Sequence, residues 1–328
     1  MRTCYLSVMQ DAVSFDYPDI LDYWDITFQK IHPELIILGS PQRTSHRIVI
    51  EDIDQNKYIL EKIPEGKFCH KQLISHTLAY LETQKINGIN SYVKNKDNKF
   101  VTEVNGSYWQ IVPYISGISL NRPEYVFDEW RGKKTSAFLI DLWKSTTNIN
   151  KVIHLPFFSL KQYVLKMAND MKTVNPHEYQ KVLPLISYLK TDFFTIYDQI
   201  PTRFCHGDYH PLNIIWGDNS LKAVIDWEFL GTKIETYDMA NLLGCIGVEE
   251  PTSLINDFAV TFIQEIKDSM ILSDSSLSYL FECMLSLRFA WLAEWLRTKD
   301  WEMIDLEIDY LLLLLDRKDE IKKEWNAV

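Results

Sequence analysis

The chain has 328 residues, of which 46% are hydrophobic and 24% are charged, and its formal net charge is −11 at pH 7. This is the composition of an ordinary globular protein that is long enough for about two domains. The excess of acidic residues argues against a nucleic-acid partner, because binding to nucleic acid depends on Lys and Arg side chains that neutralise phosphates.

Cysteine usage and hydropathy exclude several further classes. The five cysteines are scattered and form no CxxC pair, so the sequence predicts neither a disulfide framework nor a zinc site. Asp11 and Asp16 stand where a signal peptide would need an apolar run. The longest aliphatic run, Leu311 to Leu315, is too short to span a bilayer. We therefore expect a cytoplasmic protein without a membrane partner.

The first third of the chain alternates as strands do. A helical run begins at Pro18 and is ended by Pro33. Alternating and β-branched residues then predict three strands, a helix and two further strands, with Asn105-Gly106 as the turn of a hairpin. The ranges are 35–39, 47–51 and 57–63 for the first strands, 68–84 for the helix, and 100–104 and 108–114 for the last strands. The pattern indicates an antiparallel sheet with one helix.

The rest of the chain has mainly helical spacing. We expect helices at 124–131, 134–151, 159–171, 177–200, 251–270, 275–299 and 301–325, with short strands at 214–216 and 222–225. The segment 113–117 has the composition of a linker. We therefore expect an α+β fold with two lobes, an N-terminal lobe over 1–115 and a helical C-terminal lobe over 116–328.

Three polar residues in the second lobe have the spacing that phosphoryl transfer requires. Asp208 lies five residues before Asn213, and Asp226 follows at the end of a short apolar run. A carboxylate such as Asp208 can orient a hydroxyl group and accept its proton. The oxygens of Asn213 and Asp226 are hard donors, which suit Mg²⁺ better than zinc.

The motifs around these residues resemble those of the aminoglycoside phosphotransferase and choline kinase superfamily, which are small-molecule kinases with a protein-kinase-like fold. The segments are His206-Gly207-Asp208-Tyr209-His210-Pro211-Leu212-Asn213, then Ile225-Asp226-Trp227-Glu228, then Tyr237-Asp238-Met239-Ala240. They occur in the order and at the separation typical of that superfamily. The match is specific over about forty residues and looser over most of the chain.

The resemblance implies a role for each motif residue. Asp208 is expected to be the catalytic base, and Asn213 and Asp226 are expected to be metal ligands. Two further residues support the site: His206 would hold the catalytic loop by hydrogen bonds, and Glu228 would be an outer group or the ligand of a second metal.

Two residues near the motifs have competing interpretations. Asp238 would bond the backbone of the catalytic loop, or it would simply be the N-cap of the helix that follows. His210 is expected to be architectural rather than catalytic.

In the first lobe the resemblance calls for a lysine that contacts the nucleotide phosphates. Lys62 lies on the third predicted strand, and strict alternation puts it on the same face as Tyr58 and Leu60. The preceding loop, 39–46, contains a single glycine rather than a glycine-rich pattern. We expect backbone groups and the hydroxyls of Ser40, Thr44 and Ser45 to serve the phosphates instead.

Two more features of the first lobe concern the nucleotide. The helix after Lys62 carries no acidic residue before Glu82, so the usual lysine–glutamate pair lacks a partner, and Gln72 or His76 could replace it. Pro113, Tyr114 and Ile115 would form the hinge that reads the nucleotide base. Because proline has no N–H, the hydrogen-bond donor must be Tyr114 or Ile115.

The identity of the phosphate acceptor is the part of the function that the sequence indicates least clearly. Trp291 and Trp295 lie four residues apart on one face of a predicted helix, with Glu294 beside them. They could hold a cationic amine by cation–π contact or stack on a sugar ring, or they could simply pack the core.

The sequence as a whole predicts a Mg²⁺-dependent phosphotransferase. It would move the γ-phosphoryl group of ATP or GTP to a hydroxyl of a sugar, an amino sugar, an aminoglycoside or an amino alcohol such as choline. The alternative is a kinase-like module that binds nucleotide or ligand without turnover, which the irregular glycine loop and the missing helix glutamate favour. The short segment between Asp226 and Asp238 leaves no room for the activation loop of a protein kinase.

Overall fold

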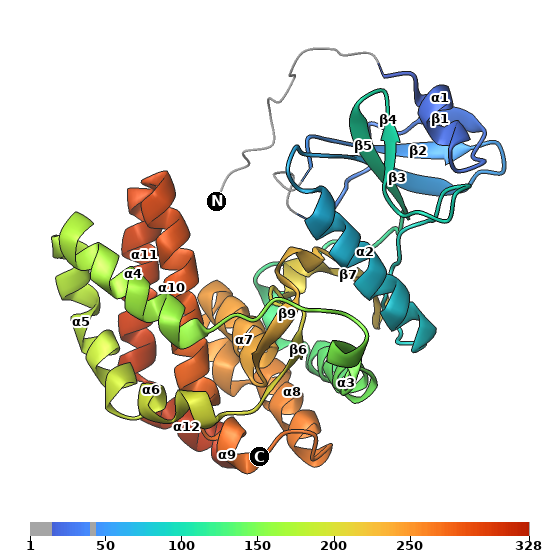
Figure 1. The fold of residues 1–328 in the computed structure, drawn as a ribbon. Coiled ribbons are helices and arrows are strands. Elements are labelled where there is room, and N and C mark those ends of the chain that lie inside the picture. The colour runs from blue at the N-terminus through green and yellow to red at the C-terminus, as the bar shows by residue number, and fades with distance from the viewer. Residues whose placement is uncertain (1–14, 40–43, 328) are drawn as a thin grey trace. The chain divides into compact units, whose positions relative to one another are not determined.

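A computed structural model describes residues 15–39 and 44–327 of the chain (Figure 1). The described residues form two compact units. Of the described residues, unit 1 contains 15–37, 44–72 and 92–114, and unit 2 contains 38–39, 73–91 and 115–327. This grouping differs from the expected boundary at 115/116 mainly in that most of the first long helix and the loop after it belong to unit 2.

Unit 1 is built on a five-stranded antiparallel sheet with the strand order β1-β2-β3-β5-β4. The strands are β1 (Phe28–Ile31), β2 (His46–Asp52), β3 (Lys57–Ile63), β4 (Thr102–Val104) and β5 (Ser107–Pro113). A short helix, α1 (Tyr17–Asp22), precedes them, and α2 (Phe68–Thr83) begins in this unit. Asp16 caps α1 by accepting a hydrogen bond from the backbone N–H of Asp19 at 3.2 Å.

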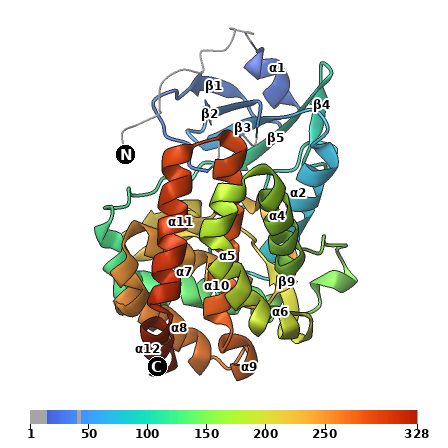
Figure 2. The same ribbon diagram turned by 90° about the vertical axis from the view of Figure 1, so that its left-hand side faces the viewer.

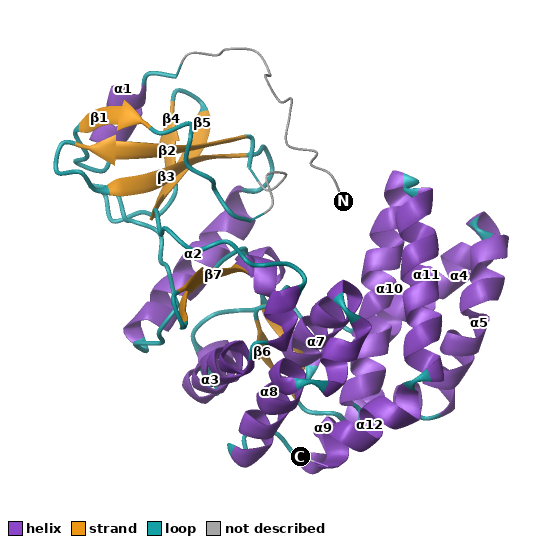
Figure 3. Cartoon of the chain, turned by 180° about the vertical axis from the view of Figure 1, so that it is seen from behind, coloured by secondary structure: helices purple, strands orange, loops and turns teal. Residues whose placement is uncertain are grey.

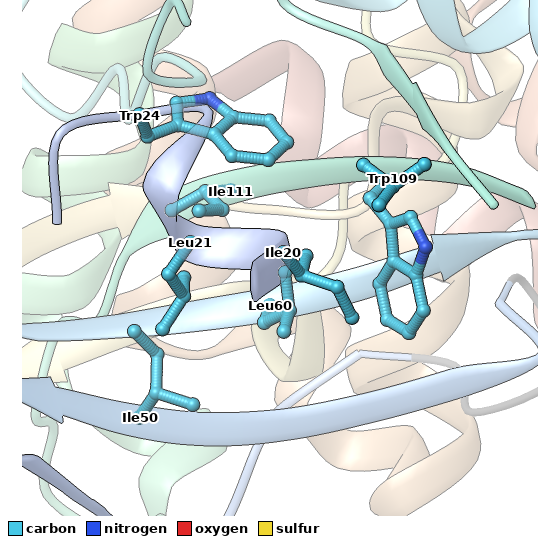
Figure 4. Packing of buried hydrophobic residues seen from close by; sticks show 8 residues of the cluster. Ile20, Leu21, Trp24, Ile50, Leu60, Trp109 and Ile111 are labelled. Atoms are coloured by element: carbon cyan, nitrogen blue, oxygen red, sulfur yellow. The ribbon is translucent and has the colours of Figure 1, made fainter. Parts of the chain in front are cut away.

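The core of unit 1 lies between α1 and one face of the sheet. Figure 4 shows Ile20 and Leu21 of α1 against Ile50, Leu60 and Ile111 of the central strands, with Trp24 and Trp109 at the two ends. All of these side chains are buried. Alternation along β3 therefore assigns one face of the sheet to this core and leaves the other face for different contacts.

Unit 2 is mainly helical (Figures 2 and 3). Its longer helices are α3 (Glu129–Ser145), α4 (Leu160–Val174), α5 (Pro176–Thr191), α7 (Tyr237–Glu249), α8 (Asp257–Asp268), α10 (Leu280–Thr298), α11 (Trp301–Asp316) and α12 (Lys318–Ala327). The short ones are α6 (Phe193–Ile196) and α9 (Asp274–Leu277). α10 packs against α4, α7 and α11, and α3 packs against α8.

Two small antiparallel ribbons interrupt the helices of unit 2. β6 (Thr202–Cys205) pairs with β9 (Gly231–Ile234), and β7 (Ile214–Gly217) pairs with β8 (Ser220–Val224). The loops that leave these four strands carry the predicted catalytic motifs. The ribbons therefore fix the positions at which those loops begin and end.

The expected fold class is confirmed, whereas some predicted elements are wrong. Residues 35–39 form no strand, and the first strand is β1, which begins seven residues earlier. β1 was missed because its mostly exposed residues show no clear apolar alternation. β6 and β9 were not predicted as elements, and α7 was expected only as the helix that would follow an N-cap at Asp238. β6 and β9 are short strands that lie far apart in the sequence and pair with each other, and only this pairing identifies them as strands.

The helices and the cysteines bear on two further expectations from the sequence. No helix in the described ranges has both the length and the apolar character needed to cross a bilayer. Cys69, Cys205, Cys245 and Cys283 are free thiols, and Cys4 lies outside the described residues.

The close approach of α3 to α8 generates the first prediction. A Cβ atom at Gly132 would lie 2.5 Å from the carbonyl oxygen of Phe258 and 3.2 Å from the backbone nitrogen of Phe262. Gly132→Ala should therefore lower the free energy of unfolding by about 1–3 kcal/mol, although alanine is the better helix former. Urea unfolding measures the change, and Lys134→Ala, at an exposed position of the same helix, is the control. Equal stability of the two variants would contradict the close packing.

Candidate active site

Asp208 lies on the loop between β6 and β7, where two side chains orient its carboxylate. The Nδ2 amide of Asn213 donates to the backbone oxygen of Asp208 at 3.0 Å and to its Oδ2 at 3.1 Å. The Nε2 atom of His210 lies 3.6 Å from Oδ1 of the same carboxylate. Asn213 is buried, whereas the Asp208 side chain keeps 19% of its surface exposed. The carboxylate is thus held in one orientation and is still accessible.

The backbone of this loop is held by Asp238, in the first turn of α7. Its Oδ2 accepts a hydrogen bond from the N–H of His206 at 2.7 Å, and its Oδ1 accepts one from the N–H of Gly207 at 2.8 Å. Asp238 is fully buried. The N-cap position of α7 is occupied by Thr236, so the loop-bonding interpretation holds and the N-cap interpretation is wrong.

His206 joins the catalytic loop to the segment that carries Asp226. Its Nε2 atom is 3.0 Å from the carbonyl oxygen of Ile225, and its Nδ1 atom accepts a hydrogen bond from the N–H of Asp208 at 3.1 Å. Because a carbonyl only accepts and an N–H only donates, the ring must be the neutral Nε2–H tautomer. The ring of His206 therefore links the backbone of this loop to the backbone before Asp226.

Gly207 is required by the close packing of this loop. Its φ is +86°, and a Cβ atom would lie 2.0 Å from the carbonyl oxygen of Phe229. No other residue combines this backbone conformation with so small a volume. The glycine therefore lets the loop pass directly against the segment that follows Asp226.

Asp226 is brought next to Asn213 by the backbone. The residue follows β8, adopts a left-handed conformation with φ 63° and ψ 59°, and begins a 3₁₀ turn that contains half-buried Glu228. The N–H of the preceding Ile225 donates to the backbone oxygen of Asn213 at 2.9 Å. A left-handed non-glycine residue is uncommon, and aspartate is one of the residues that adopt this conformation most readily.

The donor set at this point fits Mg²⁺. It offers the carboxylate of Asp226 and the amide oxygen of Asn213, whose nitrogen is committed to Asp208. Among the described residues, no three His, Cys, Asp or Glu side chains come together as a metal site. Mg²⁺ is commonly held by one or two protein oxygens, with phosphates and water as the remaining ligands, so this sparse set suits a metal that arrives with a nucleotide.

Part of the predicted phosphate loop lies beside Asp226. Gly39 groups with unit 2, has φ +90°, and a Cβ atom there would lie 3.8 Å from Oδ2 of Asp226. Ser40 lies outside the described residues. In unit 1 the Oγ of Ser45 donates to the carbonyl oxygen of Lys62 at 3.2 Å, whereas the buried Oγ1 of Thr44 has no hydrogen-bond partner within the described ranges.

Lys62 occupies the face of the sheet that carries the core of unit 1. It pairs with His46 on one side and Trp109 on the other, and its Nζ lies 5.2 Å from the ring centre of Phe15 and 6.0 Å from that of Trp109. The alternation expected for β3 is therefore confirmed. The next residue back, Glu61, lies on the opposite face, where it is buried.

The face occupied by Glu61 carries a polar cluster that the sequence did not reveal. The carboxylate of Glu61 lies 3.1 Å from Nε of Arg47 and accepts a hydrogen bond from Nε2 of Gln110 at 2.6 Å. The proposed substitutes for a helix glutamate differ in burial: Gln72 is half-buried, while His76 and Glu82 are exposed. The most buried charged side chain of α2 is Lys71, at 3% exposure.

At the predicted hinge, one of two candidate donors is already used. The N–H of Tyr114 donates to the backbone oxygen of Lys57 at 2.9 Å, which extends the β3–β5 pairing. Tyr114 is thus excluded as the donor to a nucleotide base, and Pro113 has no N–H. Of the candidates named from the sequence, only the N–H of Ile115 is left.

Trp291 and Trp295 of α10 stand beside the catalytic loop. The ring centre of Trp291 is 6.3 Å from that of His210 and 6.1 Å from that of Trp295, and both tryptophans are half-buried. The indole N–H of Trp295 is buried without a hydrogen-bond partner among the described residues. The pair is therefore neither fully in the core nor fully exposed.

Two ion pairs lie beside this tryptophan pair. Both carboxylate oxygens of Glu294 accept hydrogen bonds from Arg297, at 2.6 and 2.7 Å. Arg288 lies 5.6 Å from the ring centre of Trp291 and forms a buried ion pair with Glu307, at 2.5 and 2.7 Å. This buried pair joins α10 to α11.

Burial shifts two pKa values in the catalytic loop in opposite directions. The apolar surroundings of His206 disfavour its charged form and lower its pKa to about 4. Burial raises the pKa of Asp238 to about 6, although the two backbone N–H groups oppose the shift. Both groups change protonation over the same range of pH.

These shifts predict the pH dependence of an Asp238→Asn variant. The stability that depends on neutral His206 is present above pH 6.5 and is lost as the pH falls toward 4. The contribution of Asp238 to the free energy of unfolding is greatest below pH 3.8 and is lost as the pH rises through 6. The contributions of His206 and Asp238 therefore change in opposite directions with pH in the wild type. Without Asp238 the His206 term is unopposed, and the stability gap between wild type and variant should widen as the pH is lowered from 6.5 to 4.5.

Urea unfolding at a series of pH values measures that gap. The slope attributable to one group is at most about 1.4 kcal/mol per pH unit. Asp218→Asn, at an exposed turn, is the matched control and should show a constant gap. A gap that stays constant or narrows for Asp238→Asn would contradict the buried-carboxylate assignment.

Comparison with known proteins places this geometry in a family. The chain aligns with homoserine kinase of Zymomonas mobilis at 26% identity over 155 residues, which is 47% of this chain and 46% of that enzyme. The chain thus spans about half the length of this curated relative.

Similar solved structures cover most of the chain. They include a microcompartment-associated aminopropanol kinase (TM-score 0.69, 12% identity, 92% of this chain and 96% of that one). They also include an aminoglycoside phosphotransferase from Alicyclobacillus acidocaldarius (TM-score 0.64, 11% identity, 94% of both chains) and an aminoglycoside phosphotransferase in complex with GDP and kanamycin (TM-score 0.61, 16% identity, 91% and 97%). At these identities the likeness concerns the fold. The sequence profile of the phosphotransferase enzyme family matches residues 97–266, just over half of the chain, and the protein therefore belongs to that family.

Proposed function

We propose that the protein is a small-molecule kinase that moves the γ-phosphoryl group of ATP or GTP to a hydroxyl group. The observation that carries this proposal is the arrangement around Asp208. Its carboxylate is oriented by Asn213 and stays accessible, and its loop is clamped by Asp238 and tied through His206 to the segment of Asp226. Membership of the phosphotransferase family and the match to homoserine kinase support the same class of reaction.

Asp208 would act on the acceptor hydroxyl. Its carboxylate accepts a hydrogen bond from that hydroxyl and takes its proton as the oxygen attacks the γ-phosphorus. The new bond joins the acceptor oxygen to phosphorus, and the bond from the γ-phosphorus to the β-phosphate bridging oxygen breaks. The amide of Asn213 keeps the carboxylate aligned and reduces the motion that must be frozen before the reaction.

Asn213 and Asp226 would hold Mg²⁺, and Glu228, two residues further on, would support them. When bound, the ion supplies positive charge that offsets the charge on the transferring phosphates. Asp226 keeps a fixed backbone conformation, and the chain at Gly39 passes close enough for its backbone to approach the same phosphates. Ser40, Thr44 and Ser45 would complete that loop, and the N–H of Ile115 would read the base at the hinge.

The catalytic assignment predicts the behaviour of Asp208→Asn. The amide cannot accept the proton, so kcat should fall by about 10²–10⁴-fold while the urea unfolding midpoint stays close to that of the wild type. Turnover is measured with ATP and with GTP against homoserine, aminopropanol, kanamycin, spectinomycin, choline, glucose and glucosamine. Asp218→Asn is the control. Wild-type rates in the Asp208 variant would refute the base assignment, and nucleotide binding without turnover of any acceptor would favour a binding module.

For the acceptor, the surroundings of Trp291 and Trp295 favour a neutral hydroxylated ring. The carboxylates near the pair are committed to Arg297 and Arg288, and the guanidinium of Arg288 already occupies a cation–π position on Trp291. The carboxylates of Glu294 and Glu307 are therefore not available to balance a quaternary or primary ammonium group on this tryptophan pair. A sugar ring can stack on an indole face, and the unpaired indole N–H of Trp295 can donate to one of its hydroxyls.

This acceptor assignment predicts an effect on KM. Trp291→Ala should raise the KM of the preferred acceptor by about tenfold, as expected from the loss of roughly 1.5 kcal/mol of stacking, and should change kcat and the KM of the nucleotide much less. Trp301→Ala removes an exposed tryptophan of α11 and is the control. An unchanged acceptor KM would show that Trp291 only packs the helix, and a preference for choline over glucose would contradict the neutral ring.

A further inference from the structure

Unit 2 buries a lysine that is not one of the proposed catalytic or metal-binding residues. Lys233 lies on β9, opposite Arg203 of β6, and only 5% of it is exposed. Among the described residues its ammonium group forms no ion pair with a carboxylate and donates one hydrogen bond, to the backbone oxygen of Phe229 at 2.7 Å. Removing a charged ammonium group from water is costly, and burial lowers the pKa of Lys233. Packing alone therefore does not explain a lysine at this position.

Two aromatic rings lie beside the ammonium group of Lys233. Its Nζ lies 5.4 Å from the ring centre of Phe158 and 5.3 Å from that of Tyr237, and these two rings meet edge to face. Cation–π contacts of this kind partly offset the loss of hydration. Tyr237 is the first residue of α7 and directly precedes Asp238. The lysine is thus held beside the same end of α7 that carries the carboxylate of the catalytic loop.

The carbonyl that Lys233 binds ends the turn that begins at Asp226. Trp227–Phe229 form this 3₁₀ turn, Asp226 is its N-cap, and the N–H of Leu230 closes it by donating to the oxygen of Trp227 at 3.2 Å. The last carbonyls of a helical turn have no partner within the turn and carry partial negative charge, so a cation is favourable there. Lys233 therefore caps the end of the turn opposite to Asp226.

The same carbonyl is the point at which the turn contacts the catalytic loop. A Cβ atom at Gly207 would lie 2.0 Å from the oxygen of Phe229, so only glycine allows the loop to pass this close. Gly207 directly precedes Asp208, and its N–H donates to Asp238. The Phe229 carbonyl thus contacts both the loop that carries Asp208 and the ammonium group of Lys233. All of these residues belong to unit 2.

We propose that Lys233 is a positioning residue of the candidate active site: by holding the carbonyl of Phe229, it fixes the turn that begins at Asp226 against the catalytic loop. The proposal rests on the proposed function, in which Asp208 acts on the acceptor hydroxyl and Asp226 is a metal ligand. These two carboxylates lie on different segments of the chain, so their separation depends on contacts that join the segments. A methionine in place of Lys233 would fill a similar volume without a buried charge, but it could not hold the carbonyl.

The test is hydrogen exchange of Lys233→Met, followed by mass spectrometry on the full chain without nucleotide or metal. Peptides that cover residues 226–230 should exchange about tenfold faster than in the wild type, as expected from the loss of a hydrogen bond with a charged donor, while peptides from α3, α8 and α11 stay within about twofold. The urea unfolding midpoint should stay close to that of the wild type, because removal of the buried charge offsets the lost hydrogen bond.

Turnover of the same variant tests the consequence for the reaction. With the nucleotide and the acceptor that the wild type turns over fastest, kcat should fall by about 10- to 100-fold, because the two carboxylates are no longer held at a fixed separation. The KM of the acceptor should stay within about threefold. Lys233→Arg keeps a positively charged donor and should lie between Lys233→Met and the wild type.

Lys267→Met is the matched control. The Nζ atom of Lys267 also donates to a backbone oxygen, that of Trp325 at 2.7 Å, but it lies on α8, outside the candidate site. This variant should change neither the exchange at 226–230 nor kcat.

The outcomes separate the role of Lys233 from the proposed function. Unchanged exchange at 226–230, or faster exchange with an unchanged kcat, overturns the positioning role and leaves the kinase proposal standing. Faster exchange throughout the chain with a lower urea midpoint identifies a structural role and overturns it as well. If the wild type turns over no acceptor, the proposed function itself fails. The exchange measurement needs neither nucleotide nor acceptor, so the two failures are distinguished.

Discussion

The buried carboxylate of Asp238 is the contact on which the catalytic loop depends. It replaces water for two consecutive N–H groups, those of His206 and Gly207, at a point where the chain forms neither helix nor sheet. A buried backbone N–H without a partner costs about 1–3 kcal/mol, so one side chain offsets two such costs. Asp238 is the second residue of α7. The helix therefore helps to fix the position of the loop that carries Asp208, and this position does not depend on contacts within the loop alone.

Hydrogen bonds through Ile225 link the catalytic loop to the segment that carries Asp226. The His206 ring bonds the carbonyl of Ile225, and the N–H of Ile225 bonds the backbone of Asn213. The proposed base and the two proposed metal ligands therefore belong to a single hydrogen-bonded network. Such networks are sensitive to the loss of any member, because each remaining group is left buried without its partner.

The residues of the candidate site could be named from the sequence because they are close together in the chain. Asp208, Asn213 and Asp226 fall within one short segment, and their spacing alone restricts the chemistry. The same reasoning failed where a decision depended on distant partners. Alternation placed Lys62 and Glu61 on opposite faces of β3, yet only the packing of α1 and the Phe68–Tyr108 contact show which face each helix covers. The hydrogen bond from the Tyr114 N–H to Lys57 could not be predicted either, because its partner is distant in the sequence. The same is true of the β6–β9 pairing.

The ion pair between Arg288 and Glu307 has a consequence for how this protein can evolve. It fixes the register of α10 against α11 at a buried point one turn before Trp291, and Arg288 also reaches the carbonyl of Gly244 on α7 at 3.4 Å. Residues 291, 294 and 295 can therefore change while the helix that carries them keeps its place. The proposed acceptor surface can thus vary by substitution at these positions. Arg288 and Glu307 can change only together, since a change of either one alone would leave a buried charge without its counterpart.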